Sequence, residues 1–356
     1  MAIYSVITGT GSSIPSEIKK NSDFMNSTFL NEDGTPFKSD NSVIIDKFKQ
    51  ITGIEERRYA VDSQNASDLA FIAADKAIEN AGINKNDIDQ IIVAHNFGDV
   101  KKGSVQGDTL PSLASKVKNK LGILNANCVA YDLLFGCPGW IQGIIHAEAF
   151  IKSGMAKNIL VIGTETLSRV VDDYDRDSMI YADGAGAVII QATESSDNKG
   201  IISYGAKTFT EEETNYLFFG ESYKTDGKEN TSYIKMHGRK IYEFALNNVP
   251  NAMKEILDTS GYKISDVKKI LIHQANEKMD EAIIKRFYRL YKSQALEGIM
   301  PMSIHKLGNS SVATVPTLLD LILNNKMEGH KIEQGDIVIF ASVGAGMNIN
   351  AVVYKF

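Results

Sequence analysis

An internal repeat is the feature of this sequence that most constrains its fold. Residues 82–94 read Gly-Ile-Asn-Lys-Asn-Asp-Ile-Asp-Gln-Ile-Ile-Val-Ala, and residues 261–273 read Gly-Tyr-Lys-Ile-Ser-Asp-Val-Lys-Lys-Ile-Leu-Ile-His, a shift of 179 positions. The same shift carries the apolar run 159–162 onto the run 338–341. Because this shift is close to half of the 356 residues, the sequence predicts two copies of one structural unit.

Each copy has the same local order of helix, glycine turn and strand. Apolar residues at helical spacing precede Gly82 and Gly261, and a short β-branched run without polar alternation follows each turn. Strands of that kind are buried on both faces of a sheet. We therefore expect an α/β protein of two halves, 1–195 and 196–356, each a mostly parallel sheet with helical cover, packed as one body. The polar stretch 221–232 predicts a surface loop.

Composition and charge exclude several classes of protein. The chain is 43% hydrophobic and 23% charged, with a net charge of −6, so it can bury a core and lacks the basic excess that nucleic-acid binding needs. No run reaches the roughly 18 apolar residues of a membrane span, and the first residues lack the basic region of a signal peptide. We expect a cytoplasmic protein with no membrane span and no nucleic-acid partner.

One of the two cysteines lies where a strand-like run passes into a helix. Residues 129–140 read Val-Ala-Tyr-Asp-Leu-Leu-Phe-Gly-Cys-Pro-Gly-Trp, and Pro138 suits a first helical turn because its missing N–H costs nothing there. Free backbone N–H groups and the dipole at a helix start favour an anion, so we expect Cys137 to have a lowered thiol pKa and to be a candidate nucleophile. The alternative is a buried cysteine acting as a small hydrophobe. Cys128 is assigned to the core.

Three segments of the second half offer partners for a thiolate. His273 ends a predicted strand, where ligand sites of parallel sheets gather, although it could also cap a turn. Asn309 opens a small-residue turn before a helix, where asparagine is also a common cap or turn former. The stretch 342–347, Ser-Val-Gly-Ala-Gly-Met, is either a tight hairpin or a turn whose N–H groups approach a substrate oxygen.

The order and spacing of these motifs carry a family resemblance. The motifs are Gly136-Cys137-Pro138-Gly139, His273-Gln274-Ala275-Asn276, Gly308-Asn309-Ser310-Ser311 and Gly344-Ala345-Gly346, with Thr52-Gly53-Ile54-Glu55-Glu56-Arg57 and Asp183-Gly184-Ala185-Gly186-Ala187 beside them. Together they resemble β-ketoacyl-acyl-carrier-protein synthase III, a thiolase-fold condensing enzyme, nearly from end to end. The resemblance implies a thiolase-like fold in which two pseudo-duplicated α/β halves pack as a layered αβαβα structure.

The resemblance also implies a chemistry. Cys137 would be acylated by a primer thioester, and His273 and Asn309 would hold the thioester oxygen of a malonyl extender as CO2 leaves. The backbone N–H groups of Cys137 and Gly346 would form the oxyanion hole. Coenzyme A or acyl-carrier-protein thioesters would be the substrates, and no metal or redox cofactor would be needed.

Substrate contacts follow from the same resemblance. Asn276 would lie along the pantetheine tunnel, Arg176 would bind coenzyme A, and Leu110 would lie near the dimer seam and the acyl pocket. Similar enzymes hold the coenzyme adenine with a tryptophan and an arginine at positions that are Lys47 and Ile51 here. The resemblance therefore does not extend to these two contacts with an acetyl-CoA primer, and it leaves the identity of the primer open.

The expected protein partners are an acyl-carrier protein and a second copy of the chain. Lys278, Lys285 and Arg286 fall at i, i+7 and i+8 of one predicted helix, so they share a face and match basic positions that similar enzymes use for the acidic carrier. The alternative is an ordinary solvated face. A homodimer is implied by the family.

The leading hypothesis is a decarboxylating Claisen condensation that starts fatty-acid synthesis. The runner-up is a related condensing enzyme of specialised lipid, resorcinol or polyketide biosynthesis. A hydroxymethylglutaryl-CoA synthase is less favoured because its general-acid glutamate has no evident counterpart. A non-catalytic partner subunit is disfavoured because Cys137, His273 and Asn309 are all present. A cysteine hydrolase would release acid and no CO2.

Overall fold

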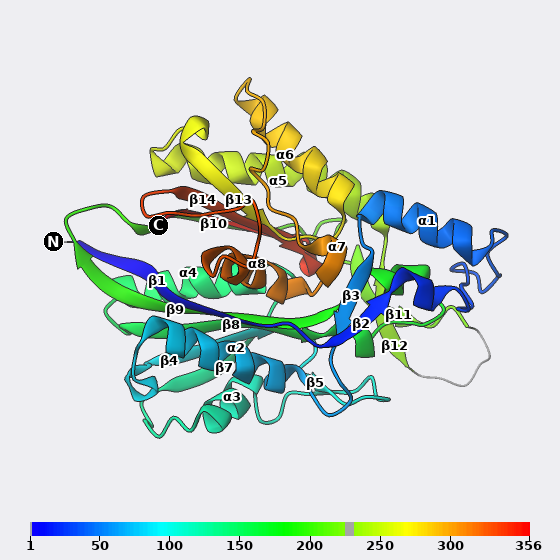
Figure 1. The fold of residues 1–356 in the computed structure, drawn as a ribbon, viewed down its shortest axis with the longest axis horizontal. Helices are drawn as coiled ribbons and strands as arrows, with labels where there is room; N and C mark the ends of the chain where they lie inside the picture. Colours follow the sequence, from blue (N-terminus) through cyan, green and yellow to red (C-terminus); the bar gives the residue numbers. More distant parts are fainter. Residues whose placement is uncertain (1, 225–230) are drawn as a thin grey trace.

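Two β-sheets form the framework of the structure, a computed structural model that describes residues 2–224 and 231–356 (Figure 1). The first sheet has the order β1 (Ala2–Ser13), β9 (Asp183–Ser195), β8 (Asn158–Thr166), β4 (Gln90–His95) and β7 (Val129–Leu134). The second has the order β10 (Gly200–Thr208), β15 (Asn348–Lys355), β14 (Ile337–Gly344) and β13 (Val267–Ile272). The second sheet repeats the strand order of the first four strands, which confirms the duplication. Residues 225–230 of the predicted loop lie outside the described residues.

The prediction of mostly parallel sheets is wrong. In the first sheet β4 is parallel to β7 and β8, but β9 is antiparallel to β8 and β1. In the second sheet only β13 and β14 are parallel. The reason lies in the connections, because antiparallel strands can be joined by a short turn, whereas a parallel pair needs a crossover. β14 passes into β15 through the short turn Ala345–Met347.

Helices complete five layers (Figure 1). The helices are α2 (Ala66–Ala81) and α3 (Leu113–Leu121) outside the first sheet, α4 (Gly139–Lys152) and α8 (Thr314–Leu323) between the sheets, and α5 (Gly238–Ser260) and α6 (Glu277–Leu290) outside the second. This arrangement is the predicted αβαβα structure. Within residues 2–224 and 231–356, every helix is too short or too polar to cross a bilayer.

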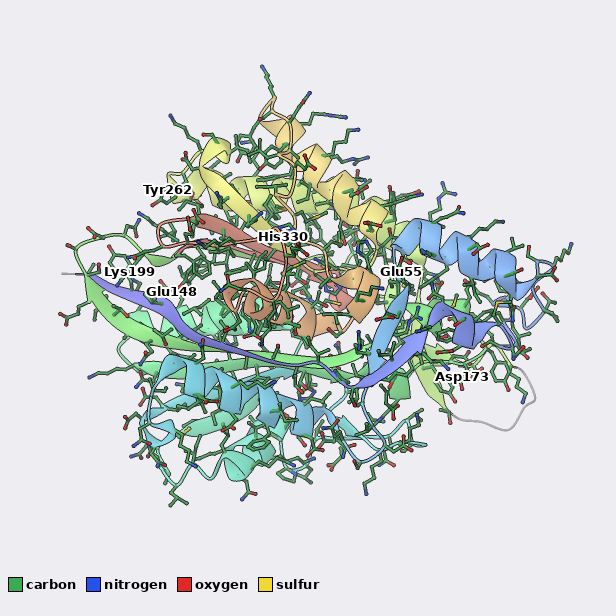
Figure 2. All side chains as sticks on the ribbon, viewed as in Figure 1. Glu55, Glu148, Asp173, Lys199, Tyr262 and His330 are labelled. Atoms are coloured by element: carbon green, nitrogen blue, oxygen red, sulfur yellow. The ribbon has the colours of Figure 1, made fainter. Side chains whose placement is uncertain are left out.

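Adjacent residues of the central strands point into different layers. Leu160 and Ile162 of β8 pack in the cluster beneath α2, while Ile159 and Val161 pack in the cluster around α4 and α8. Side chains fill the spaces between the layers (Figure 2). Burial on both faces explains why these strands are continuous apolar runs. Burying each such side chain contributes about 1.5–3 kcal/mol to the free energy of unfolding.

A cap of short elements covers one end of the layers (Figure 1). It contains α1 (Asn41–Thr52), the pair β2 (Glu17–Lys20) and β3 (Glu56–Tyr59), the pair β11 (Leu217–Glu221) and β12 (Ser232–Met236), and the nearby α7 (Ile304–Leu307), β5 (Asp99–Val100) and β6 (Gly107–Asp108). Lys235 of β12 is buried and lies 2.6 Å from Asp172 and 3.1 Å from Asp175. This ion-pair network fastens the β11–β12 hairpin to the loop that carries Arg176.

Candidate active site

A cavity of about 1090 Å³ lies where the parallel strands end. Cys137 follows β7, His273 follows β13, and Asn309 lies in the turn before α8; all three line the cavity. The carboxyl ends of parallel strands meet at one edge of a sheet, where ligand sites gather. The structure therefore brings the three predicted residues to one site.

The turn before α4 positions Cys137. Pro138 is the N-cap and α4 begins at Gly139, so the predicted strand, turn and helix are present. A Cβ added to Gly344 would lie 2.6 Å from the Cys137 nitrogen, and one added to Gly136 would lie 2.6 Å from the Ala345 nitrogen. Only glycine at these two positions allows the turn after β14 to pack this closely against the Cys137 turn.

The thiol is not activated by its position alone. Burial raises the pKa of Cys137 to about 11, and the Ser311 hydroxyl opposes this shift with a smaller effect. The expectation of a lowered thiol pKa is therefore wrong, because the cost of removing the thiolate from water outweighs the hydrogen bonds that favour the thiolate. Cys128 is buried in the core beneath α2, as predicted.

His273 is neutral at physiological pH. Its side chain is 4% exposed, and burial lowers the pKa of its imidazole to about 4, against a smaller opposing effect of the Ser311 backbone. Its Nδ1 has no hydrogen-bond partner among the described residues. A neutral imidazole can donate one hydrogen bond to an oxygen without carrying charge into the cavity.

Asn309 is held rigidly on both sides. Its backbone nitrogen donates to the Ile180 carbonyl at 3.0 Å, and its carbonyl accepts from the Ala182 nitrogen at 2.8 Å. The Ser311 nitrogen donates to Asn309 Oδ1 at 2.8 Å. Because Oδ1 is occupied, the Nδ2 group is left to donate into the cavity that Asn309 lines.

Three polar residues to which the sequence analysis gave no catalytic role form a hydrogen-bonded chain that ends at Cys137. Ser311 Oγ donates to Cys137 Sγ at 3.3 Å, and Asn96 Nδ2 donates to Ser311 Oγ at 3.2 Å. Asn96 also donates to Glu165, whose pKa burial raises to about 8. The sequence signal that could have found Glu165 is a carboxylate that closely follows the apolar run 159–163.

Of the two residues predicted to form the oxyanion hole, Cys137 and Gly346, only Cys137 lines the cavity. Cys137 lines the cavity, and so do Gly344 and Ala345 of the turn after β14. Gly346 is not among the lining residues; with a φ of +73° it turns the chain toward β15. The contribution of the Gly346 N–H stays a prediction, and Ala345, which belongs to the same predicted turn and lines the cavity, is a second candidate donor.

Predicted substrate contacts lie around the cavity. Asn276 lines it while its Oδ1 accepts from the Met279 nitrogen at 3.1 Å and caps α6. Lys47, Ile51 and Arg176 also line it. The basic and exposed lining residues are Lys47, Arg176, Arg239 and Lys240. Such a group suits the phosphates of a phosphopantetheine or coenzyme A handle.

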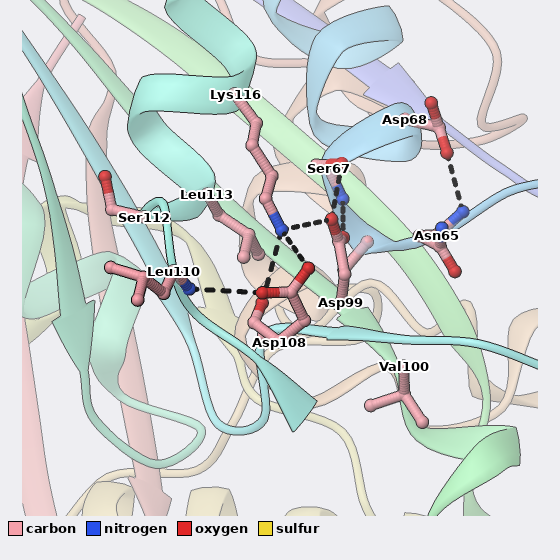
Figure 3. A network of polar contacts seen from close by, with 12 residues as sticks. Asn65, Ser67, Asp68, Asp99, Val100, Asp108, Leu110, Ser112, Leu113 and Lys116 are labelled. Atoms are coloured by element: carbon pink, nitrogen blue, oxygen red, sulfur yellow. Dashed lines mark hydrogen bonds and ion pairs between the residues drawn. The ribbon is translucent and has the colours of Figure 1, made fainter. Parts of the chain in front are cut away.

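Leu110 does not line this cavity. Its side chain is 89% exposed, and the loop that carries it is fastened on the surface by Lys116, which lies 3.0 Å from Asp99 and 2.9 Å from Asp108 (Figure 3). The Leu110 nitrogen donates to Asp108 Oδ1 at 3.2 Å. The predicted acyl-pocket contact is therefore absent within the described part of a single chain.

The predicted carrier-docking residues all lie exposed on α6 but have different surroundings. Lys278 lies between Asn276 and Met279, which both line the cavity. Lys285 borders a separate surface pocket at the far end of the helix. Arg286 donates to the Leu246 carbonyl at 3.0 Å and to Asn247 Oδ1 at 2.9 Å, so it also holds α6 to α5.

Across residues 2–224 and 231–356, no three His, Cys, Asp or Glu side chains are placed to hold a metal ion. The lining of the cavity offers a thiol, neutral hydrogen-bond donors and, among its exposed residues, basic side chains.

The five-layer duplicated fold, with its cavity at the strand ends, defines a thiolase-fold condensing enzyme. A family model for 3-oxoacyl-[acyl-carrier-protein] synthase III matches residues 131–208, and the model of its C-terminal part matches residues 257–356. The beta-ketoacyl-[acyl-carrier-protein] synthase III 1 of Vibrio vulnificus (strain YJ016) is 34% identical, over 99% of this chain and 100% of the relative.

Solved structures agree with this assignment. The 3-oxoacyl-[acyl-carrier-protein] synthase III of Aquifex aeolicus VF5 is 28% identical, with a TM-score of 0.79 over 99% of this chain and 100% of that chain. The priming beta-ketosynthase of the R1128 polyketide pathway, 22% identical over 99% of this chain and 96% of that one, shares the fold with a TM-score of 0.81. The chain belongs to the 3-oxoacyl-[acyl-carrier-protein] synthase III family of condensing acyltransferases.

Proposed function

We propose that this enzyme joins an acyl thioester primer to malonyl-acyl-carrier protein, with loss of CO2, through an acyl group held on Cys137. The observation that carries the proposal is the meeting of Cys137, His273 and Asn309 at one cavity. Neutral donors beside a thiol suit a reaction in which negative charge develops on a thioester oxygen.

The first step is acyl transfer. Cys137 Sγ attacks the primer carbonyl, the carbonyl oxygen becomes an oxyanion held by backbone N–H groups, and the primer's thiolate leaves. The proton lost by the cysteine ends on the departing thiol, so no external acid or base is consumed. One oxyanion-hole donor is typically worth about 3–4 kcal/mol.

The second step is decarboxylation and condensation. His273 and Asn309 would donate to the malonyl thioester oxygen, so the electron pair released as CO2 leaves is stabilised as an enolate. The enolate carbon attacks the acyl carbonyl and expels the Cys137 thiolate, which takes up one proton from solvent. The products are CO2, a 3-oxoacyl-carrier thioester and the free enzyme. The two thioesters and this proton account for all atoms of the products.

The cavity suits such substrates. A volume of about 1090 Å³ is at the upper end for small-molecule pockets, which run to about 1,000 Å³, and leaves room for a pantetheine arm and an acyl chain together. Phe97, Phe219 and Met236 give one part of the wall an apolar surface. The basic residues of the rim would bind the phosphates, and Lys278, Lys285 and Arg286 would meet the acidic carrier.

The pathway we propose is the start of fatty-acid synthesis. The test is to incubate the protein with malonyl-carrier and a panel of acyl-CoA and acyl-carrier primers, and to identify products by mass spectrometry. A 3-oxoacyl-carrier product extended by two carbons, with one CO2 per product, supports the proposal. Release of free acid without CO2 would instead indicate a hydrolase. Products assembled from two long acyl chains would favour the specialised-lipid alternative.

A further inference from the structure

A line of polar side chains runs from Cys137 into the protein interior. Ser311 Oγ donates to Cys137 Sγ at 3.3 Å, Asn96 Nδ2 donates to Ser311 Oγ at 3.2 Å, and the same Nδ2 donates to Glu165 Oε1. The four residues come from four segments: the turns after β7 and β4, the end of β8, and the short turn of helix before α8. The condensation steps above do not use Asn96 or Glu165.

The network fixes the direction of each hydrogen bond. Glu165 Oε1 also accepts from the backbone N–H of Asn96 at 2.9 Å, so the side-chain amide must present its nitrogen to the same oxygen. The second hydrogen of that amide then points to Ser311 Oγ. Because Oγ is accepting from Asn96, its own single hydrogen is directed toward Cys137 Sγ.

Ser311 is held in a conformation that serves this contact. Its φ of 52° lies in the left-handed region, which is uncommon for a residue other than glycine and costs about 1–3 kcal/mol. Its nitrogen donates to Asn309 Oδ1 at 2.8 Å while its hydroxyl faces the sulfur. One strained residue thus orients the amide of Asn309 and a donor for the thiol together.

The charge state of Glu165 is compatible with a thiolate nearby. Its side chain is 1% exposed, and burial raises its pKa to about 8, with Asp183 adding a smaller effect in the same direction. At pH 7 the carboxyl group is therefore mostly protonated. It can accept both Asn96 hydrogen bonds through Oε1 without placing a second negative charge near the sulfur.

We propose that Glu165 and Asn96 are positioning residues that hold the Ser311 hydroxyl as a donor to Cys137 Sγ, and that this donor stabilises the thiolate for acyl transfer. The inference rests on the proposed role of Cys137 as the nucleophile. It adds three residues to the reaction: Ser311 touches the reacting sulfur, and the other two act through it.

The test is the pH dependence of Cys137 alkylation by iodoacetamide, followed by peptide mass spectrometry so that Cys128 is counted separately. Ser311→Ala should slow alkylation at pH 8 by about tenfold or more, because one hydrogen bond to a charged group is worth at least that ratio, and should shift the profile to higher pH. Asn96→Ala should shift it in the same direction by less. Ionisation of Glu165 above its pKa of about 8 raises the pKa of the Cys137 thiol, so Glu165→Leu is compared with Glu165→Gln, which also lacks the charge but keeps a carbonyl acceptor. The alkylation profile of Glu165→Leu should lie at higher pH than that of Glu165→Gln.

Ser310→Ala is the matched control, since it removes the neighbouring hydroxyl and should leave the alkylation profile unchanged. An unchanged profile in Ser311→Ala would overturn the proposal, and so would equal profiles for Glu165→Leu and Glu165→Gln. Should Glu165→Leu fail to fold by circular dichroism, Ser311→Ala and Asn96→Ala still decide the matter. Failure of the proposed function would look different: the parent would be alkylated at Cys137 but would take up no acyl group from a thioester.

Discussion

At the scale of single residues, the site depends on groups that burial keeps neutral. Burial raises the pKa of Cys137 to about 11 and lowers the pKa of His273 to about 4. The two therefore do not form a resting thiolate–imidazolium pair at pH 7. The imidazole is available as a neutral donor, and the thiolate must form as the primer binds, with hydrogen bonds in place of a nearby cation.

Replacing Asn309 separates the two steps of the reaction. Asn309→Ala should lower the condensation rate by about 10²–10³, the usual cost of removing one oxyanion donor, while acylation of Cys137 changes little. Rapid-quench measurement of acyl uptake and of CO2 release checks both steps. Asn324→Ala, at the end of α8 and away from the cavity wall, is the control. Equal losses in both steps would contradict the assignment of Asn309 to the enolate.

The burial of His273 should also appear in stability. An unfolded histidine takes up a proton near pH 6.5, but His273 does so only near pH 4, so between these values the unfolded state binds more protons. The native state must therefore lose stability as pH falls. Between pH 7 and pH 5, the free energy of unfolding in urea should fall by about 2 kcal/mol more for the parent than for His273→Gln. Parallel curves for the two proteins would show that His273 titrates normally.

At the scale of elements, the sequence predicted the helices and strands whose apolar residues repeat at a regular spacing. It missed features that depend on contacts between distant segments. The helices before Gly82 and Gly261, the apolar strands after them and the helix after Cys137 are present because each is a run with a repeating pattern. Strand direction was mispredicted because it depends on how strands are connected. The sequence analysis did not identify Glu165, because its partners Asn96 and Ser311 come from distant segments that meet only in the folded chain.

The packing of α2 on β1 offers a test of element contacts. A Cβ on Gly11 would lie 2.3 Å from the Ala73 carbonyl oxygen and 2.6 Å from the Ala77 nitrogen. Gly11→Val must push the helix from the strand, so it should lower the free energy of unfolding by about 1–3 kcal/mol in urea. Gly238→Ala, whose added Cβ would meet no atom within 4 Å outside its chain neighbours and its own helix backbone, should not lower it. Equal stability of the two variants would contradict the close approach.

At the scale of the whole molecule, duplication places the reacting groups on different repeats. Cys137 follows a strand of the first sheet, whereas His273 follows a strand of the second. The α4–α8 layer between the sheets holds these edges together.

The pairing of two such chains stays a prediction. The strand β7 is available for it, because β7 is an edge strand of the first sheet, with Val129 56% and Leu134 66% exposed.

Carrier docking is tested by charge reversal. Lys278→Glu should raise the KM for malonyl-carrier about fivefold, which is the effect expected from the loss of one exposed ion pair of about 1 kcal/mol. Lys285→Glu should raise this KM by a smaller factor, because Lys285 lies farther from the cavity. Acyl loading of Cys137 from a small thioester should not change in either variant. Lys199→Glu, at the opposite end of the molecule from the cap (Figure 2), is the control. Equal effects on loading and on carrier turnover would contradict docking at α6.

The most direct test of the central claim is the intact mass of the protein after exposure to a mixture of acyl thioesters. We predict one acyl group per chain, mapped to Cys137, which is absent from Cys137→Ser and is discharged as 3-oxoacyl-carrier when malonyl-carrier is added. A Cys137→Ser protein that still condenses, or an acyl group mapped to another residue of the parent, would contradict the account.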